Sequence, residues 1–485
     1  MSYNEIKAAY TAAGQDHVFT FYDQLSSEEQ STFLAQLKSI DPHRITNIAK
    51  TVLAPEISNE SIISVGPEIT PLPDSATASL FTASADQIVD WKKKGTALIA
   101  ENAVAVVLLA GGQGTRLGST APKGCFDIGL PSHKSLFALQ AERILSLQKV
   151  VAHSTGSGKV TIPWYIMTSG PTRAPTQAFF QQHSYFGLEE ENIIFFEQGV
   201  LPCIDNAGKI MLETKSKVAV APDGNGGIYR ALTEAGVLKD LKKRGIRHLH
   251  AYCVDNCLVR MADPVFLGFA ASRNVSVATK SVPKRNPTEN VGLIVSKDNH
   301  PAVIEYSEIS DEMAHRTVAS VEGTSALAFR TANIVNHYYS LAYLETIPTW
   351  RENYLPYHVA KKKIPCIDLS SGETLTPSTP NGIKLEQFIF DCFPQLNMSE
   401  FANLEVSRDD EFSPLKNKAG TVGEDDADSS RADLMKQGKR WLLASGAHVP
   451  ESILGVEVPP LLSYAGENLE WTKGLTFDTE KEISK

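Results

Sequence analysis

The sequence lacks the features that mark three common classes of protein. The apolar run at residues 103–110 is far shorter than the ~20 residues that a membrane-spanning helix needs. The net charge is −10, so there is no excess of basic residues to form a nucleic-acid surface. The six cysteines include no CxxC pair, which argues against a zinc knuckle and against a thiol redox motif.

Another absence bears on where the protein acts and what it contacts. The first residues, MSYNEIKAAY, do not show the basic-then-apolar pattern of a secretion signal. We therefore expect a cytoplasmic protein with no membrane and no nucleic-acid partner, and a monomer, although an oligomer stays open. The composition, 42% hydrophobic and 21% charged, is that of a globular protein, and 485 residues suggest several domains.

Residues 1–100 predict an amino-terminal helical region. Ser26 and Glu29 have the spacing of a capping box, and apolar residues follow at helical spacing until Pro42 interrupts the pattern. A further helix is expected at about residues 85–100, where apolar residues again recur at helical spacing.

Residues 101–385 predict a catalytic domain of the α/β class. Short apolar, β-branched segments alternate with helical patterns, which is typical of a doubly wound, mostly parallel, Rossmann-like sheet. Strands are expected at residues 103–110, 160–168, 192–198, 248–255, 275–282 and 291–296, and helices at 134–151 and 228–245. Ligands of such sheets bind beyond the carboxyl ends of the strands.

Residues 386–485 predict a small carboxyl-terminal domain of a different kind. The acidic stretch EDDADSSR at 424–431 is expected to be a solvated loop. After it, short apolar segments alternate with frequent Pro and Gly, as in VPESILGVEVPPLLSYAGENLEWTKG. This pattern favours short strands and therefore a small β-rich domain.

The stretch AVAVVLLAGGQGTRLGSTAPKG at 103–124 combines a buried-strand pattern with glycines and basic residues. Glycine lets a chain turn sharply and lets a ligand approach the backbone N–H groups closely. Such N–H groups suit an anion, and Arg116 and Lys123 add two positive charges. The stretch therefore predicts a phosphate-binding loop; an ordinary strand-to-helix turn would not need both cations.

Two familiar phosphate loops do not fit this stretch. The dinucleotide fingerprint requires a third glycine where Leu117 stands, which weakens the alternative of a dinucleotide-dependent oxidoreductase. The P-loop requires Ser or Thr after Gly-Lys, but Val160 follows Gly158-Lys159. The stretch HLHAYCVDNC at 248–257 offers His and Cys as metal ligands, but we favour a strand with alternating side chains there.

Several motifs together resemble a known family. LAGGQGTRLG with PKG resembles the nucleotide loop of sugar nucleotidyltransferases. The further motifs are FFEQGVLPC at 195–203, APDGNGGIYRAL at 221–232, YCVDN at 252–256, PNGIKLEQFIFD at 380–391 and EFSPLKN at 411–417. The chain, most clearly at 100–420, is similar to the eukaryotic UDP-N-acetylglucosamine pyrophosphorylases within the UDP-sugar pyrophosphorylase family, and their fold is expected here.

The resemblance implies a Mg²⁺-dependent reaction of UTP with N-acetylglucosamine 1-phosphate that gives UDP-N-acetylglucosamine, a precursor of glycans and cell-wall chitin, and pyrophosphate. It implies catalytic roles for Arg116 and Lys123, and metal binding by Asp255. Nucleotide binding is implied for Leu109, Ala110, Gly111, Gly112, Gln198, Gly224, Asn225 and Lys416. Sugar-phosphate binding is implied for Asn225, Gly292, Glu305, Tyr306, Asn333 and Lys384.

Two alternatives stay open at the level of sequence. One is the same chemistry on another sugar 1-phosphate, of the galactosamine or glucose type, because UDP-sugar enzymes share the nucleotide half of the site. The other is a non-catalytic nucleotide-sugar sensor, although a sensor does not need the charges that Arg116, Lys123 and Asp255 supply for a transition state.

Overall fold

The chain forms two compact units in the computed structural model, which describes residues 1–54, 68–319, 325–350, 354–421 and 423–485. The first unit comprises Met1–Gly66, Gln198–Ala231 and Thr349–Asp391. The second comprises Pro67–Glu197, Leu232–Pro348 and Cys392–Lys485. The predicted division into domains at residues 101 and 386 stays a prediction.

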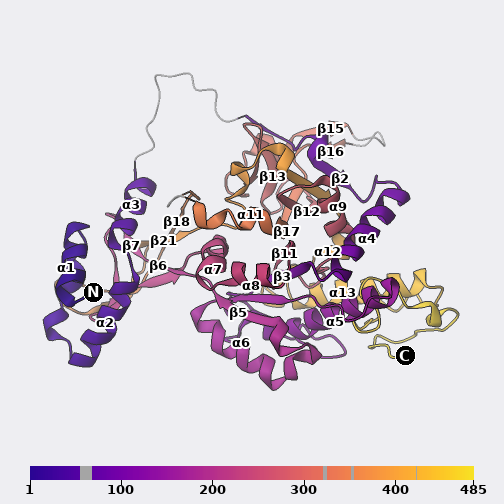
Figure 1. Ribbon diagram of the computed structural model, residues 1–485, viewed down its shortest axis with the longest axis horizontal. Coiled ribbons are helices and arrows are strands. Elements are labelled where there is room, and N and C mark those ends of the chain that lie inside the picture. Colours follow the sequence, from indigo (N-terminus) through magenta and orange to yellow (C-terminus); the bar gives the residue numbers. More distant parts are fainter. Residues whose placement is uncertain (55–67, 320–324, 351–353, 422) are drawn as a thin grey trace. The chain divides into compact units, whose positions relative to one another are not determined.

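The first unit packs amino-terminal helices against short strands (Figure 1, indigo helices). The capping box predicted at Ser26 and Glu29 is confirmed, and Pro42 follows the end of the helix that this box begins. Pro42 is also the first residue of a second helix, a position that suits proline. The Asp41 side chain caps this helix by accepting hydrogen bonds from its first free N–H groups. The elements are α1 (Tyr3–Ala12), α2 (Ser27–Ser39), α3 (Pro42–Val52), β6 (Val200–Pro202), β7 (Ile204–Asp205), β8 (Leu212–Thr214), β9 (Lys217–Val218), β10 (Val220–Pro222), β18 (His358–Lys362), β19 (Cys366–Ile367), β20 (Thr374–Leu375) and β21 (Gly382–Glu386).

The second unit is built on one large sheet, with strand order β2-β22-β12-β17-β11-β3-β4-β5. Neighbouring strands along this order are parallel, except that β17 runs antiparallel to both β12 and β11. β13 branches from β17, and β14 and β1 pair with β13. The predicted mostly parallel α/β sheet is therefore confirmed. Its strands are β1 (Ile69–Thr70), β2 (Thr77–Ser79), β3 (Val104–Leu109), β4 (Trp164–Thr168), β5 (Ile193–Glu197), β11 (His248–Cys253), β12 (Val277–Pro283), β13 (Leu293–Lys297), β14 (His300–Ile304), β17 (Thr331–Ser340) and β22 (Phe401–Glu405).

Helices flank this sheet, and the predicted helix at 85–100 is confirmed as α4. The helices of the unit are α4 (Ala85–Ala100), α5 (Leu136–Thr155), α6 (Gly170–Gln182), α8 (Val237–Lys243), α9 (Pro264–Arg273), α10 (Asp311–His315), α11 (Leu341–Leu344), α12 (Arg408–Glu411) and α13 (Ala427–Ala444). α7 (Ile228–Glu234) spans the junction between the units, and a hairpin of β15 (Thr317–Ala319) and β16 (Ser325–Leu327) completes the list. No helix in the described part of the chain is long and apolar enough to cross a membrane.

Three predictions of local structure are wrong in whole or in part. The helix expected at 228–245 is interrupted by Gly236, whose φ of 72° lies in the left-handed region, so it forms α7 and α8. The acidic stretch at 424–431 is not a loop throughout, because Asp426 caps α13 through the Ser429 N–H group. The described residues beyond 444 form turns, isolated bridges and one short 3₁₀ helix, Glu470–Thr472, in place of the expected β-rich pattern.

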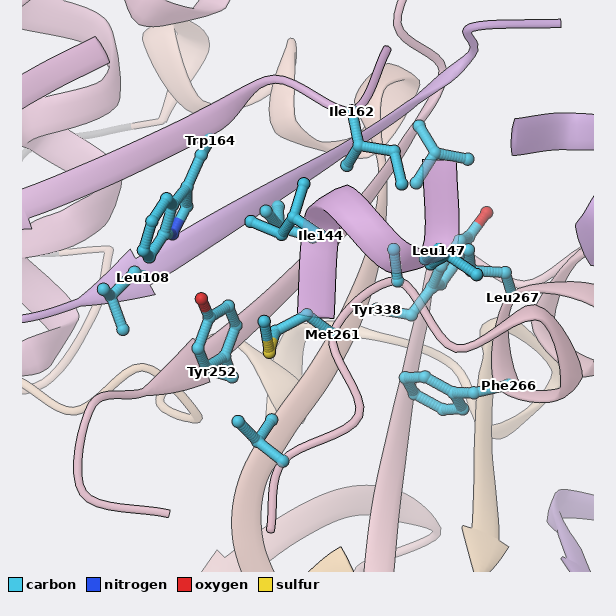
Figure 2. Close-up of a cluster of buried hydrophobic side chains, with 14 of the residues drawn as sticks. Leu108, Ile144, Leu147, Ile162, Trp164, Tyr252, Met261, Phe266, Leu267 and Tyr338 are labelled. Carbon is cyan, nitrogen blue, oxygen red and sulfur yellow. The ribbon is translucent and has the colours of Figure 1, made fainter. Parts of the chain in front are cut away.

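The core of the second unit lies where β3, β4 and β11 pack against α5. All six residues of β3 are buried, as expected for a strand covered on both faces. Figure 2 shows Leu108, Trp164 and Tyr252, from three neighbouring strands, beside Ile144 of α5. This buried layer fixes the ends of β3 and β11, from which the loops described below emerge.

Two helices of the second unit, α4 and α9, lie side by side (Figure 1). They touch through glycines. A Cβ added to Gly95 would lie 1.9 Å from the carbonyl oxygen of Pro264, and one added to Gly268 would lie 1.8 Å from that of Trp91. Real atoms cannot approach so closely, so the two backbones can meet only because both positions lack a side chain.

We expect Gly95→Ala to lower the melting temperature, because the added methyl group must push α4 away from α9. Overpacking of this kind costs ~1–3 kcal/mol, more than the ~0.5–1 kcal/mol that alanine gains in a helix. Gly170→Ala is the matched control, since Gly170 also lies in a helix and a Cβ there meets no atom within 4 Å. Equal melting temperatures for the two variants would contradict this account of the contact.

Candidate active site

The glycine-rich loop after β3 is pinned at its base. The Ala110 N–H group donates to Met167 O at 2.8 Å, and Ser169 Oγ donates to Gly111 O at 2.7 Å. The loop then folds back on itself, with Lys123 N–H donating to Gly112 O at 3.3 Å. This arrangement leaves a tip that carries Arg116, which is exposed and has no hydrogen bond or ion pair to any described residue.

Two glycines of this loop differ in their surroundings. Gly112 is exposed, and a Cβ on it would meet no protein atom within 4 Å. Gly124 is buried, and a Cβ on it would lie 2.2 Å from the ring of Phe137. Packing therefore explains glycine at Gly124 but not at Gly112, which fits the prediction that the backbone at Gly112 faces a ligand.

Lys123 links the loop to two other segments at the same edge of the sheet. Its Nζ donates to Leu415 O at 2.9 Å and lies 3.9 Å from Oδ2 of Asp255. The Lys123 side chain is 17% exposed. The bond to Leu415 uses one of three ammonium hydrogens, so two remain for a phosphate group.

Asn256 joins the Asp255 turn to the segment 411–417, a connection that sequence reasoning missed. Its Nδ2 donates to Glu411 O at 2.7 Å, and its Oδ1 accepts from Ser413 N–H at 3.0 Å. In addition, Leu415 N–H donates to Asp255 O at 2.9 Å. The VDN motif could have indicated this role, since a buried Asn must satisfy both a donor and an acceptor.

A buried ion cluster lies behind this junction. Lys280 of β12 is fully buried, and its Nζ bonds Asp263 Oδ2 at 2.6 Å and also Glu411 Oε2. Arg260 lies 4.0 Å from Glu411. Burial alone would raise the pKa of Asp263, but the charges of Lys280 and Arg260 outweigh it and hold that pKa below its ordinary value.

Lys416 follows this junction directly. Its side chain is half exposed, and its Nζ lies 3.5 Å from Oδ2 of Asp425. Arg116, Lys123 and Lys416 all belong to the second unit. A hydrogen bond from Lys123 to Leu415 O joins the glycine-rich loop to the segment that carries Lys416. Lys123 and Lys416 each lie beside a carboxylate, Asp255 and Asp425, and with Arg116 they are the cations that the sequence predicts for a polyphosphate.

The expected strand in HLHAYCVDNC is confirmed as β11. Burial lowers the pKa of His250 to about 3, and its Nδ1 accepts from Ala262 N–H at 2.9 Å. Burial raises the pKa of the Cys257 thiol to about 12 and moves that of Cys253 upward as well. These thiols are therefore protonated at neutral pH and poorly suited to act as nucleophiles.

Three of the predicted sugar-binding residues lie side by side. The pairing of β13 with β14 and with β17 brings Gly292 next to Glu305 and Asn333. Asn333 N–H donates to Gly292 O at 2.8 Å, and a Cβ on Gly292 would lie 3.0 Å from Oε1 of Glu305. Because β17 is antiparallel to β11, its first residues and Asp255 lie at the same edge of the sheet. Tyr306, by contrast, is 53% exposed.

The remaining predicted residues belong to the first unit. Gln198 follows β5 directly, and Lys384 lies half-buried in β21. Gly224 has a φ of 85°, and the Asn225 Oδ1 accepts from Ile389 N–H at 2.9 Å. This bond means that the Asn225 side chain has a structural contact within its own unit, and its predicted ligand contact stays a prediction.

The pinned glycine-rich loop and its cations fit a nucleotidyltransferase, and residues 59–451 match the model of the UTP--glucose-1-phosphate uridylyltransferase family. The chain belongs to this family.

Within the family, the three similar proteins described next are all named for UDP-N-acetylglucosamine. The chain is 47% identical over 480 residues to UDP-N-acetylglucosamine pyrophosphorylase of Saccharomyces cerevisiae, covering 98% of each protein. It is 42% identical to UDP-N-acetylglucosamine diphosphorylase 2 of Arabidopsis thaliana, covering 97% of this chain and 92% of that protein. The crystal structure of the uridine diphosphate N-acetylglucosamine pyrophosphorylase from Trypanosoma brucei superimposes with a TM-score of 0.82 at 32% identity, covering 97% and 95%. The resemblance noted from the motifs is therefore confirmed.

We expect Gly112→Ala to weaken UTP binding without changing the melting temperature. A methyl group forced between backbone and ligand costs ~1–3 kcal/mol, which corresponds to roughly 5-fold to 150-fold in Kd. Gly124→Ala is the matched control in the same loop, and we expect it to lower the melting temperature through its clash with Phe137. Calorimetry and thermal melting of both variants check this, and an unchanged UTP affinity for Gly112→Ala would exclude a ligand at that position.

Proposed function

We propose that this chain is a uridylyltransferase that forms UDP-N-acetylglucosamine and pyrophosphate from UTP and N-acetylglucosamine 1-phosphate. The observation that carries the proposal is the joined arrangement of the glycine-rich loop, Lys123, Asp255 and the 411–417 segment at one edge of the sheet. Full-length similarity to proteins named for this activity supports it.

The reaction brings two anions together and expels a third. A phosphate oxygen of the sugar phosphate attacks the α-phosphorus of UTP in line, and the bond to pyrophosphate breaks. In this proposal, Arg116 and Lys123 hold the UTP phosphates and stabilise the negative charge that moves onto pyrophosphate. Lys416 adds a third cation, and the loop backbone at Leu109–Gly112 lies along the nucleotide. The in-line attack by the sugar phosphate needs no nucleophile from the protein.

Asp255 is the residue that we assign to Mg²⁺. Among the described residues, no three His, Cys, Asp or Glu side chains gather closely enough to hold a metal by themselves. A single carboxylate still fits Mg²⁺, because this ion commonly binds one or two carboxylates together with substrate phosphates. When bound, the ion would neutralise phosphate charge, and the Asp255 carboxylate would hold it beside the ammonium group of Lys123.

The sugar is assigned to the row formed by Gly292, Glu305 and Asn333, with Tyr306 nearby in sequence. A carboxylate accepts hydrogen bonds, an amide also donates them, and glycine leaves room for a substituent. The further contacts proposed in the first unit are Gln198, Gly224 and Asn225 with the uridine, Asn225 also with the sugar, and Lys384 with the sugar phosphate. We also retain as proposals a cytoplasmic location, a monomeric state and a role for the product in amino-sugar metabolism, including chitin.

The decisive experiment is a pyrophosphate-release assay with UTP, Mg²⁺ and a panel of sugar 1-phosphates. We expect N-acetylglucosamine 1-phosphate to exceed glucose 1-phosphate in kcat/KM by roughly fivefold to tenfold or more, the value of at least one hydrogen bond to the acetamido group. A higher rate with another sugar would assign the same chemistry to that substrate. Binding of UDP-sugars without any pyrophosphate release would favour the sensor.

The metal assignment predicts the behaviour of Asp255→Asn, which keeps the shape of the side chain and removes its charge. We expect half-saturation by Mg²⁺ to require a roughly tenfold or higher concentration, since even loss of a group that supports a ligand costs 10–100-fold. Asp425→Asn is the control, because it removes a carboxylate that neighbours Lys416 at a position with φ of 53°, which asparagine tolerates. Identical Mg²⁺ titrations for Asp255→Asn and the parent chain would remove Asp255 from the metal site.

A further inference from the structure

Asn333 lies at an irregularity of β17 that determines how its side chain points. The register between β12 and β17 shifts here, since Ser281 pairs with Asn333 whereas Lys280 pairs with Asn336. Within this bulge Val335 has a φ of 50°, a rare conformation for a β-branched residue. The bulge directs the Val335 N–H group at Oδ1 of Asn333, at 3.1 Å.

The contacts of Asn333 identify which atom of its side-chain amide is the oxygen and which is the nitrogen. A backbone N–H can only donate, so the amide atom that faces Val335 must be the oxygen, and a flipped amide would set two donors against each other. His337 Nε2 lies 3.2 Å from the same oxygen. Because that oxygen can only accept, Nε2 of His337 must carry a hydrogen.

The state of the His337 ring follows from the same logic. Burial, with a smaller contribution from His250, lowers the pKa of His337 to about 3, so the ring is neutral at working pH. A neutral ring protonated on Nε2 has a bare Nδ1, which accepts from the Tyr339 hydroxyl at 3.1 Å. The ring also packs against Phe393, with 5.2 Å between centroids. These contacts hold one tautomer in one orientation.

We propose that His337 is a positioning residue for substrate selection: it holds Asn333 so that both amide hydrogens, and no acceptor, face the sugar. Val335 and His337 occupy both lone pairs of the Asn333 oxygen, so only the NH₂ group remains for a ligand. The ligand atom that Asn333 reads is therefore an oxygen acceptor, either the acetamido carbonyl or a ring hydroxyl. The neighbouring Glu305 carboxylate accepts hydrogen bonds, so the row pairs a donor with an acceptor. The inference rests on the proposed function.

A matched pair of variants tests the role of the Nε2 hydrogen. The amide nitrogen of His337→Gln can reach the place of Nε2, whereas the shorter side chain of His337→Asn cannot. We expect His337→Asn to raise KM for the sugar phosphate roughly fivefold to tenfold, the value of one hydrogen bond, and to leave KM for UTP unchanged. His337→Gln should recover most of this loss. An unchanged sugar-phosphate KM in His337→Asn, or equal effects on both substrates, would overturn the inference.

The sugar panel identifies the oxygen that Asn333 reads. A larger loss with N-acetylglucosamine 1-phosphate than with glucose 1-phosphate assigns the acetamido carbonyl, and equal losses assign a hydroxyl. Nitrogen-15 NMR of the parent chain tests the tautomer directly, even where a variant fails to fold: hydrogen on Nε2 supports the inference, and hydrogen on Nδ1 overturns it. If the parent chain releases no pyrophosphate with any sugar, the proposed function fails and the role in substrate selection fails with it, while the tautomer measurement still shows separately whether His337 orients the Asn333 amide.

Discussion

The arrangement of the site depends on one buried positive charge. The ammonium group of Lys280 holds Asp263, at the start of α9, and Glu411, at the end of α12. The backbone carbonyl of Glu411 accepts a hydrogen bond from the side-chain amide of Asn256. The segment after Glu411 carries the Leu415 carbonyl, which accepts a hydrogen bond from Lys123. Removing one member of such a cluster leaves uncompensated buried charge, which typically costs ~3–5 kcal/mol. The segments around Asp255 are therefore held in place by a charge that no substrate touches.

Much of the fold follows from local pattern. The buried strand before the glycine-rich loop, the alternation of strands and helices, the capping box at Ser26 and the helix at 85–100 depend on periodicity and on single residues with strong conformational preferences. The meeting of the loop and Asp255 at one sheet edge follows from the rule that parallel strands end together, and Lys123 lies 3.9 Å from Asp255.

The features that the sequence pattern did not predict depend on contacts with residues far away in the sequence. β17 carries polar residues on both sides of its bulge, so its sequence TANIVNHYYS does not read as a strand until β11 and β12 flank it. Lys280 reads as an ordinary lysine in a strand, since its carboxylate partners come from other segments. Asp426 looked like part of a solvated acidic run because a helix cap is defined by the residues after it. Asn256 is visible as a motif residue, but its role depends on a segment about 155 positions away.

The pairing of β2 with β22 has a consequence for biosynthesis. Ser79 and Glu405 form a 3.0 Å hydrogen bond across 326 positions of sequence, and the intervening chain supplies every other strand of the sheet except β1. Strands from the first quarter of the chain must wait for the last quarter before this edge can close, and such non-local pairing folds slowly. On the ribosome, the amino-terminal half will therefore emerge with an open sheet edge, a state in which chaperones act and in which neighbouring nascent chains can aggregate.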